Sequence, residues 1–114
     1  MKQNRVLSLV GLATKAGKTV SGEFSTEKAV KTGTAYLFIV SDEASDNTKK
    51  KFRNMCDYYQ VPVYFYGTKT ELGGAMGKEF RASMAVTDQG LSDAIRKQLT
   101  LANGGSEYVK NKSI

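Results

Sequence analysis

The chain has 114 residues, of which 40% are hydrophobic and 25% are charged, the composition of one soluble globular domain. Its 17 Lys and Arg residues against 11 Asp and Glu residues give a net charge of +6, which favours a polyanionic partner such as RNA. The lack of histidine and the single cysteine, Cys56, exclude a histidine-based active site, an internal disulfide and a multi-thiolate zinc site, and favour a reducing compartment.

Helices and short strands alternate along the chain. In chain order, we expect a helix over 4–16, a strand over 19–21, a helix over 26–32, a strand over 36–40, a helix over 47–59, a strand over 63–66, a helix over 68–76, a strand over 82–87 and a last helix after 88. The residues suited to cap these helices are Ser25, Ser45, Thr68 and Asp88. The alternation predicts an α/β domain over residues 1–103, with its sheet between helices and a frayed tail over 104–114.

Apolar spacing also predicts which side chains face the core. For the helix over 47–59 they are Phe52, Met55, Cys56 and Tyr59, and for the last helix they are Leu91, Ala94, Ile95 and Leu99. The run 36–40 is apolar throughout, which is typical of a strand covered on both faces. The start of the chain has neither a signal-peptide pattern nor a membrane span, so we expect a cytoplasmic protein without a membrane partner.

The stretch from Gly11 to Thr19 ends like a phosphate-binding loop. Five residues lie between Gly11 and Gly17, one more than that loop places there, and Gly11 falls inside an amphipathic helix. A helix followed by a glycine turn is the simpler interpretation. Lys18 could still contact phosphate as an exposed cation.

Three further features have a structural explanation beside a chemical one. The carboxylates of Asp42, Glu43 and Asp46 suit turn and N-cap positions better than a metal site. Cys56 is expected to be a packed hydrophobic residue, because no histidine exists to activate it. The basic run 49–53 is either a solvated helix face or an aid to the attraction of RNA.

Two segments are candidates for RNA contact. Gly22 precedes a helix whose N-terminal N–H groups could hold a phosphate, and Lys28 and Lys31 share one face of that helix. Phe80 lies between cationic residues in the segment 77–83, a mixture that can stack on an unpaired base. The alternatives are an ordinary strand–turn–helix junction and a hydrophobic plug with surface charges.

Five stretches resemble, in their order and spacing, the kink-turn-binding ribosomal protein family, and within it the small bacterial YlxQ-type members. They are Leu9-Val10-Gly11-Leu12-Ala13, Val20-Ser21-Gly22-Glu23, the run from Ser41 to Lys51, the run from Leu72 to Glu79, and Ala85-Val86-Thr87-Asp88-Gln89-Gly90. The resemblance implies a three-layer α/β/α sandwich with a mixed four-stranded sheet. It also implies binding of RNA at a sharply bent helix–internal loop–helix element.

The resemblance implies a site in two parts, since in this family a glycine-containing junction enters the RNA groove and a later loop covers a flipped-out nucleotide. The first part falls on Gly22, Glu23, Phe24, Ser25 and Lys28, the second on Lys78, Glu79, Phe80 and Arg81, with Glu43 and Ser45 as neighbours. Positions 23–25 depart from the family, in which small polar residues usually follow the glycine. Phe24 can stack on a base but cannot donate side-chain hydrogen bonds to it.

The main hypothesis is therefore a non-enzymatic protein that binds structured, kinked RNA in the ribosome or another ribonucleoprotein, with no cofactor, metal or small-molecule substrate. In this hypothesis phosphates are neutralised by Lys18, Lys28, Lys31 and Arg81. A protein-interaction module on the same scaffold is the rival hypothesis. A small phosphate-handling enzyme is a third, and it depends on the incomplete loop near Gly17.

Overall fold

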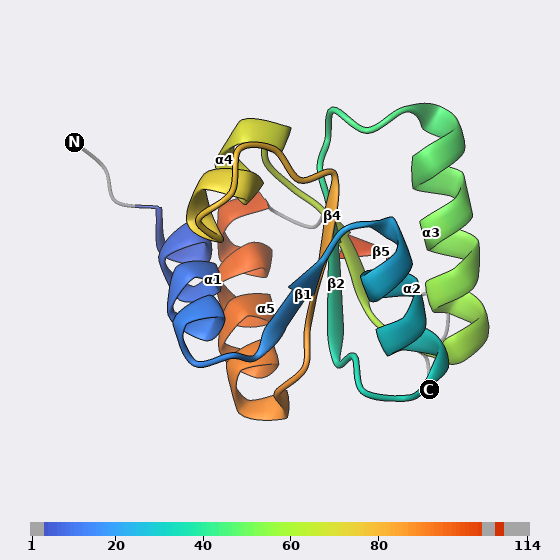
Figure 1. The fold of residues 1–114 in the computed structure, drawn as a ribbon, viewed down its shortest axis with the longest axis horizontal. Helices are drawn as coiled ribbons and strands as arrows, with labels where there is room; N and C mark the ends of the chain where they lie inside the picture. Colours follow the sequence, from blue (N-terminus) through green and yellow to red (C-terminus); the bar gives the residue numbers. More distant parts are fainter. Residues whose placement is uncertain (1–3, 104–106, 109–114) are drawn as a thin grey trace.

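The computed structural model describes residues 4–103 and 107–108 of the chain, as a sheet enclosed between two helical layers (Figure 1). The helices are α1 (Arg5–Lys15), α2 (Glu23–Lys31), α3 (Asp46–Tyr59), α4 (Lys69–Ala75) and α5 (Gln89–Asn103). The strands are β1 (Thr19–Ser21), β2 (Leu37–Val40), β3 (Val63–Phe65), β4 (Ser83–Val86) and β5 (Glu107–Tyr108). α1, α4 and α5 cover one face of the sheet, and α2 and α3 cover the other. The predicted three-layer sandwich is confirmed.

The sheet is mixed, with strand order β1-β4-β2-β3-β5. β2 pairs with β3 in parallel, while β4 runs antiparallel to both β1 and β2. β1, β2 and β3 therefore end at the same edge of the sheet, and β4 begins there. We call this the carboxyl edge; it comprises Gly22 and the segments 41–45, 66–68 and 77–82.

The strand β2 separates two hydrophobic cores. Leu37 and Ile39 face the core beneath α1, α4 and α5, whereas Phe38 and Val40 face the core beneath α2 and α3. All four side chains are fully buried, which confirms the prediction of a strand covered on both faces. The buried sheet is thus a rigid base for the loops of the carboxyl edge.

The predicted start of α2 is wrong. The helix begins at Glu23, and its N-cap is Gly22 with φ +90° and ψ 150°, so that Ser25 lies within the first turn. The strand passes directly into the helix through a single residue whose backbone conformation only glycine adopts readily. Glycine makes the turn, but it offers no side-chain oxygen to the N–H groups at the start of the helix.

Two predicted core residues are also wrong. Tyr59, at the last residue of α3, is 39% exposed and packs edge-on against Tyr58. On α5, Ala94 is exposed and Ser92 is buried, because the buried stripe follows positions 92, 95 and 99. The remaining members of both stripes are buried or partly buried as predicted.

The end of the chain adds a fifth strand that the sequence did not predict. Glu107 and Tyr108 pair antiparallel with Tyr64 and Val63 of β3. The rest of the expected frayed tail, 104–106 and 109–114, lies outside the described residues. Among the described helices, none has the length and apolar character required to cross a bilayer.

Candidate nucleic-acid interface

The loop 77–82 is held against the end of β1. The Nε of Arg81 donates a hydrogen bond to the Oγ of Ser21 at 2.8 Å, and Nη1 donates to the carbonyl of Phe80. The backbone N–H of Arg81 donates to the carbonyl of Lys69 at 3.0 Å, which fixes the same loop to the start of α4. The two segments that the sequence singled out, around Gly22 and around Phe80, therefore lie next to each other.

Gly73 sets how closely this loop approaches α4. A Cβ atom placed on Gly73 would lie 2.7 Å from the carbonyl oxygen of Glu79 and 2.8 Å from the Cα of Phe80. These distances are too short for any side chain, so the loop crosses the helix where only glycine fits. Sequence analysis missed this role, although a Gly-Gly pair inside a helix is a signal of close backbone approach.

The segment 41–45, which follows β2 at the carboxyl edge, is fixed by hydrogen bonds to the segment that follows β3 and to α4. The Oγ of Ser41 donates to the carbonyl of Gly67 at 2.9 Å and accepts from the N–H of Glu43 at 3.0 Å. The Oε1 of Glu43 accepts from the N–H of Lys69 at 2.9 Å, which satisfies one of the unpaired N–H groups at the start of α4. Glu43 thus has a structural role at the edge where the resemblance placed it.

Ser45 and Thr68, also at this edge, are helix caps. The Oγ of Ser45 accepts from the N–H of Thr48 and so caps α3. Thr68 and Glu71 form the predicted capping box of α4. In the described part of the chain, no group of three or more His, Cys, Asp or Glu residues could hold a metal ion. The turn and cap interpretation of the carboxylates is confirmed for Glu43, and Asp46 lies in the first turn of α3.

The first turn of α2 is open to a ligand. Its N-cap is a glycine with no side chain, and among the described residues no side-chain oxygen accepts from the N–H groups of Glu23, Phe24 or Ser25. Three unpaired N–H groups at a helix N-terminus favour an anion. Lys28, one turn further along, is exposed and adds positive charge.

The acidic residues of α2 are neutralised within the protein. Lys51 of α3 forms an ion pair with Glu23, and Glu27 pairs with Lys31 at 3.0 Å and with Lys51 at 3.7 Å. The hydrogen bond from Lys31, followed by the charges of Lys31 and Lys51, lowers the pKa of Glu27. Both carboxylates are paired with lysines, so they repel an approaching phosphate less than free carboxylates would.

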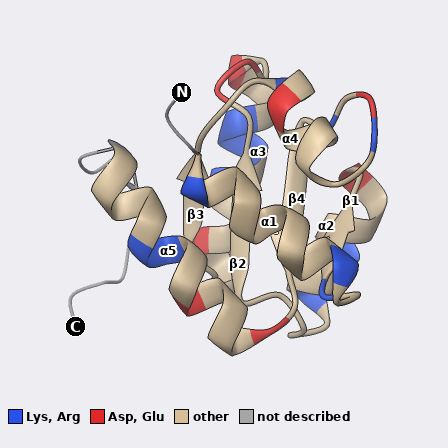
Figure 2. Ribbon diagram, turned by 90° about the vertical axis from the view of Figure 1, so that its left-hand side faces the viewer, with Lys and Arg blue, Asp and Glu red and all other residues tan. Residues whose placement is uncertain are grey.

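Two exposed aromatic side chains lie at or next to the carboxyl edge. Phe24 is 78% exposed and Phe80 is 58% exposed. Lys78 and Glu79 beside Phe80 are exposed too, and Figure 2 shows basic and acidic positions side by side in the loop that follows α4. The alternative of a hydrophobic plug is wrong, because Phe80 does not enter the core.

Two predicted site residues lie elsewhere. Lys18 precedes β1, at the opposite edge of the sheet, where its carbonyl accepts from the N–H of Thr87. Lys31 lies at the far end of α2, in the ion pair with Glu27. Lys18 is therefore separated from Gly22 by the length of the sheet, whereas Lys31 lies on the same helix as Lys28, at its C-terminal end. Spacing in the sequence does not tell which edge of a sheet a residue such as Lys18 reaches.

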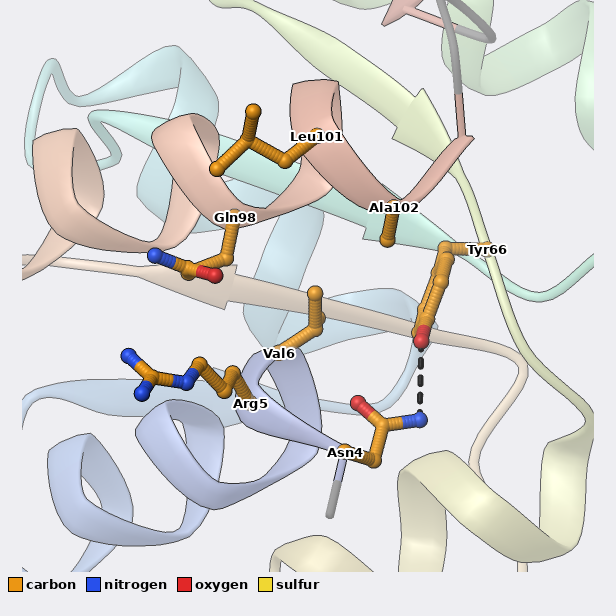
Figure 3. A pocket seen from close by; sticks show the side chains of 7 residues that line it. All are labelled: Asn4, Arg5, Val6, Tyr66, Gln98, Leu101 and Ala102. Carbon is orange, nitrogen blue, oxygen red and sulfur yellow. Dashed lines mark hydrogen bonds between the residues drawn. The ribbon is translucent and has the colours of Figure 1, made fainter. Parts of the chain in front are cut away.

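A hollow of about 390 Å³ lies between the start of α1, the end of β3 and the end of α5 (Figure 3). Its lining residues are Asn4, Arg5, Val6, Tyr66, Gln98, Leu101 and Ala102. The Nδ2 of Asn4 donates to the hydroxyl of Tyr66 at 2.8 Å across it. Sequence analysis missed this hollow because its walls come from three distant segments.

Burial decides the interpretation of Cys56, and helix geometry decides that of the stretch from Gly11 to Thr19. Cys56 is fully buried, and burial raises the pKa of its thiol to about 12, so it is not a nucleophile. Gly11 and Lys15 lie within α1, and only Gly17, with φ +73°, makes a turn. The helix and glycine turn are confirmed, and the phosphate-loop geometry is absent from this part of the described chain.

Comparison with known proteins agrees with this fold. Residues 4–96 match the model of a family described as the ribosomal protein L7Ae/L30e/S12e/Gadd45 family. The chain is 41% identical over 87 residues to a Bacillus subtilis protein named RNA-binding protein YlxQ, covering 76% of this chain and 87% of that protein. It is 34% identical over 98 residues to large ribosomal subunit protein eL30 of Tetrahymena thermophila, covering 84% and 94%. A solved structure of a protein of unknown function from Bacillus halodurans superposes with a TM-score of 0.82 at 38% identity, covering 85% of this chain and 98% of that one.

Proposed function

The chain belongs to the ribosomal protein L7Ae/L30e/S12e/Gadd45 family, and from this premise we propose that it is a non-enzymatic protein that binds kinked, kink-turn-like RNA at its carboxyl edge. The relative from Bacillus subtilis is named an RNA-binding protein, and eL30 is named a protein of the large ribosomal subunit. The first name supports an RNA partner, and the second supports a place in the ribosome or another ribonucleoprotein. We further propose that this partner is met in the cytoplasm.

One observation carries the proposal. The hydrogen bond between Arg81 and Ser21 joins the loop of Phe80 to the strand that ends at Gly22. An exposed ring and an uncapped helix N-terminus therefore belong to one surface. An aromatic ring can stack on an unpaired base, while the helix N–H groups hold a phosphate of the same RNA.

Each predicted contact then has a physical role. The N–H groups of Glu23, Phe24 and Ser25 hold a backbone phosphate, and Lys28 and Lys78 neutralise its neighbours. Arg81 positions the loop, since two of its nitrogens already donate within the protein. Glu43 and Ser45 act by fixing the helices at this edge.

Binding would select the bent form of the RNA. A kink-forming RNA is in equilibrium with an extended form, and a protein that binds only the bent form shifts that equilibrium towards it. Because the site has two separate parts, we expect a bent RNA to contact both of them and a straight duplex to contact only one. We expect affinity for shape rather than for base sequence.

A binding assay with a kink-turn RNA and a straight duplex of equal length tests the proposal. We expect at least roughly tenfold tighter binding to the kink-turn, which corresponds to about 1.4 kcal/mol. Equal affinities would contradict shape selection.

Lys28→Ala tests the assignment of the site. We expect weaker binding and a decrease of about one unit in the slope of log K against log salt, because one phosphate contact is lost. The matched control is Lys18→Ala, which removes an exposed lysine at the opposite edge and should leave the slope unchanged. An unchanged slope for Lys28→Ala, or equal losses for both variants, would remove Lys28 from the interface.

A further inference from the structure

We propose that the outer face of α2 is a second base-binding subsite, in which Phe24 stacks on one unstacked base of the RNA and Lys28 binds the adjoining phosphate. This inference rests on the proposed function and adds a contact beyond the loop of Phe80. It rests on Phe24, an exposed aromatic residue in the first turn of α2. The ligand is a single-stranded nucleotide next to the bend.

The exposure of Phe24 calls for an explanation. It is 78% exposed, the same value as Tyr58 and the largest among the exposed apolar side chains of the described residues. No aromatic ring of the described part of the chain stacks on it. An exposed phenylalanine ring buries little apolar surface on folding, and because Phe24 lines a hollow it is available to a ligand with a flat apolar face.

A hollow lies beside this ring. It has a volume of about 370 Å³ and is lined by Phe24, Glu27, Lys28 and Lys31 of α2 and by Thr32, the C-cap of that helix. Residues 24, 28 and 31 follow the spacing of one helical stripe, while Thr26, Ala29 and Val30 are buried on the opposite stripe. The ring and the side chains of two lysines therefore line one hollow.

The charges around the hollow favour a polyanion. Glu27 is held by Lys31 and Lys51, whereas no described residue pairs with the ammonium group of Lys28. Positive charge is in excess on this side of α2, because the two glutamates, Glu23 and Glu27, are outnumbered by three lysines. These are Lys28, Lys31 and, from α3, Lys51. An exposed ring beside an unpaired ammonium is the combination found where nucleic-acid single strands are bound.

The hollow is continuous with the proposed interface. Phe24 is two residues after Gly22, in the same turn whose N–H groups are unpaired. A strand of RNA bound at that turn would pass directly over the face of α2. The same continuity favours RNA over an unrelated protein partner as the occupant of this hollow.

The experiment measures the affinity of the full chain for a kink-turn RNA whose internal-loop nucleotides are replaced, one at a time, by abasic residues. An abasic residue keeps the phosphate and removes the base. We expect one position at which the abasic change weakens wild-type binding by roughly 5- to 150-fold, the range for one base stack. Phe24→Ala should cause a similar loss with the intact RNA and no further loss with that abasic RNA.

Phe24→Tyr and Phe24→Leu separate stacking from simple apolar contact. The tyrosine variant should bind within about twofold of the wild type, and the leucine variant should resemble Phe24→Ala, because leucine has no ring to stack. Tyr58→Ala is the matched control, since Tyr58 is equally exposed but lies at the far end of α3. It should leave the affinity unchanged.

The outcomes distinguish the two proposals. If the wild type does not prefer the kink-turn to the duplex, the proposed function fails. If it does but Phe24→Ala binds as well as the wild type, or loses equally with every abasic RNA, the subsite is overturned. Loss of self-association in Phe24→Ala with unchanged RNA affinity would assign the ring to a protein contact instead.

Discussion

Gly73 shows how a single residue without a side chain positions the loop of Phe80. The backbone of Glu79 and Phe80 occupies the space that a Cβ atom would need, whereas nothing lies within 4 Å of the corresponding position on Gly74. The two neighbours share a helix but face different surroundings. Their substitution therefore separates the effect of the contact from the effect of helix propensity.

We expect Gly73→Ala to destabilise the protein by about 1–3 kcal/mol, as overpacking of a close contact does, and to weaken RNA binding because the loop must move. Gly74→Ala should stabilise it by about 0.5–1 kcal/mol, since alanine favours the helix. Urea unfolding measures both free energies. Two variants of equal stability would show that the loop does not rest on Gly73.

Cys56 illustrates how burial decides reactivity at the residue scale. It is fully buried in the core beneath α2 and α3, with Phe52 one turn before it on α3. Burial raises the pKa of its thiol from 9.0 to about 12, so almost no thiolate exists at neutral pH. The sequence predicted this role correctly because Cys56 falls in an apolar helical stripe.

We expect the folded protein to react with a disulfide reagent at pH 8 only through unfolding. The rate should increase with urea in parallel with the unfolded fraction, and it should reach that of a free thiol once the chain is unfolded. Absorbance of the released thiol measures it. Rapid reaction of the native protein would show that Cys56 is accessible.

At the scale of elements, the start of α4 links three segments of the carboxyl edge. Thr68 and Glu71 form its capping box, and Glu43 reaches it from the segment after β2. The carbonyl of Lys69 in turn accepts from the N–H of Arg81. A helix of seven residues would be marginal alone, and these contacts fix where it begins.

We expect Thr68→Ala to destabilise the protein by about 1 kcal/mol, because an N–H group of the first turn loses its acceptor. Thr70→Ala is the matched control, since Thr70 is exposed in the same helix and caps nothing. That variant should be neutral or slightly more stable. Chemical denaturation compares the two, and equal free energies of unfolding would contradict the role of the box.

At the scale of the whole molecule, apolar spacing and cap residues in the sequence predict the helices and strands, but the candidate RNA interface depends on the order of the strands in the sheet. Apolar spacing predicted five helices and four of the strands in sequence order, and cap residues predicted three of the four starts correctly. The strand β5 carried no such pattern, being two residues long. The order β1-β4-β2-β3 is a tertiary property that no short segment encodes.

The same distinction explains the candidate site. Gly22 and Phe80 were identified from residue type, and the antiparallel pairing of β1 with β4 brings their segments together. Lys18 and Lys31 have the same residue type as Lys28 but lie away from the edge. The ion pairs of Lys51 could not be predicted, because they join α3 to α2 across 24 and 28 residues of chain.

The single-residue connection at Gly22 has a consequence for what changes in length this protein can tolerate. Each residue added to a helix rotates the next side chain by about 100° around the axis. An insertion between β1 and α2 would have no slack to absorb it, so it would either turn Phe24 and Lys28 away from their present direction or force Thr26, Ala29 and Val30 out of the core. A longer connection could take up an added residue within the loop, whereas a one-residue insertion at this junction would disturb the core and the proposed interface together.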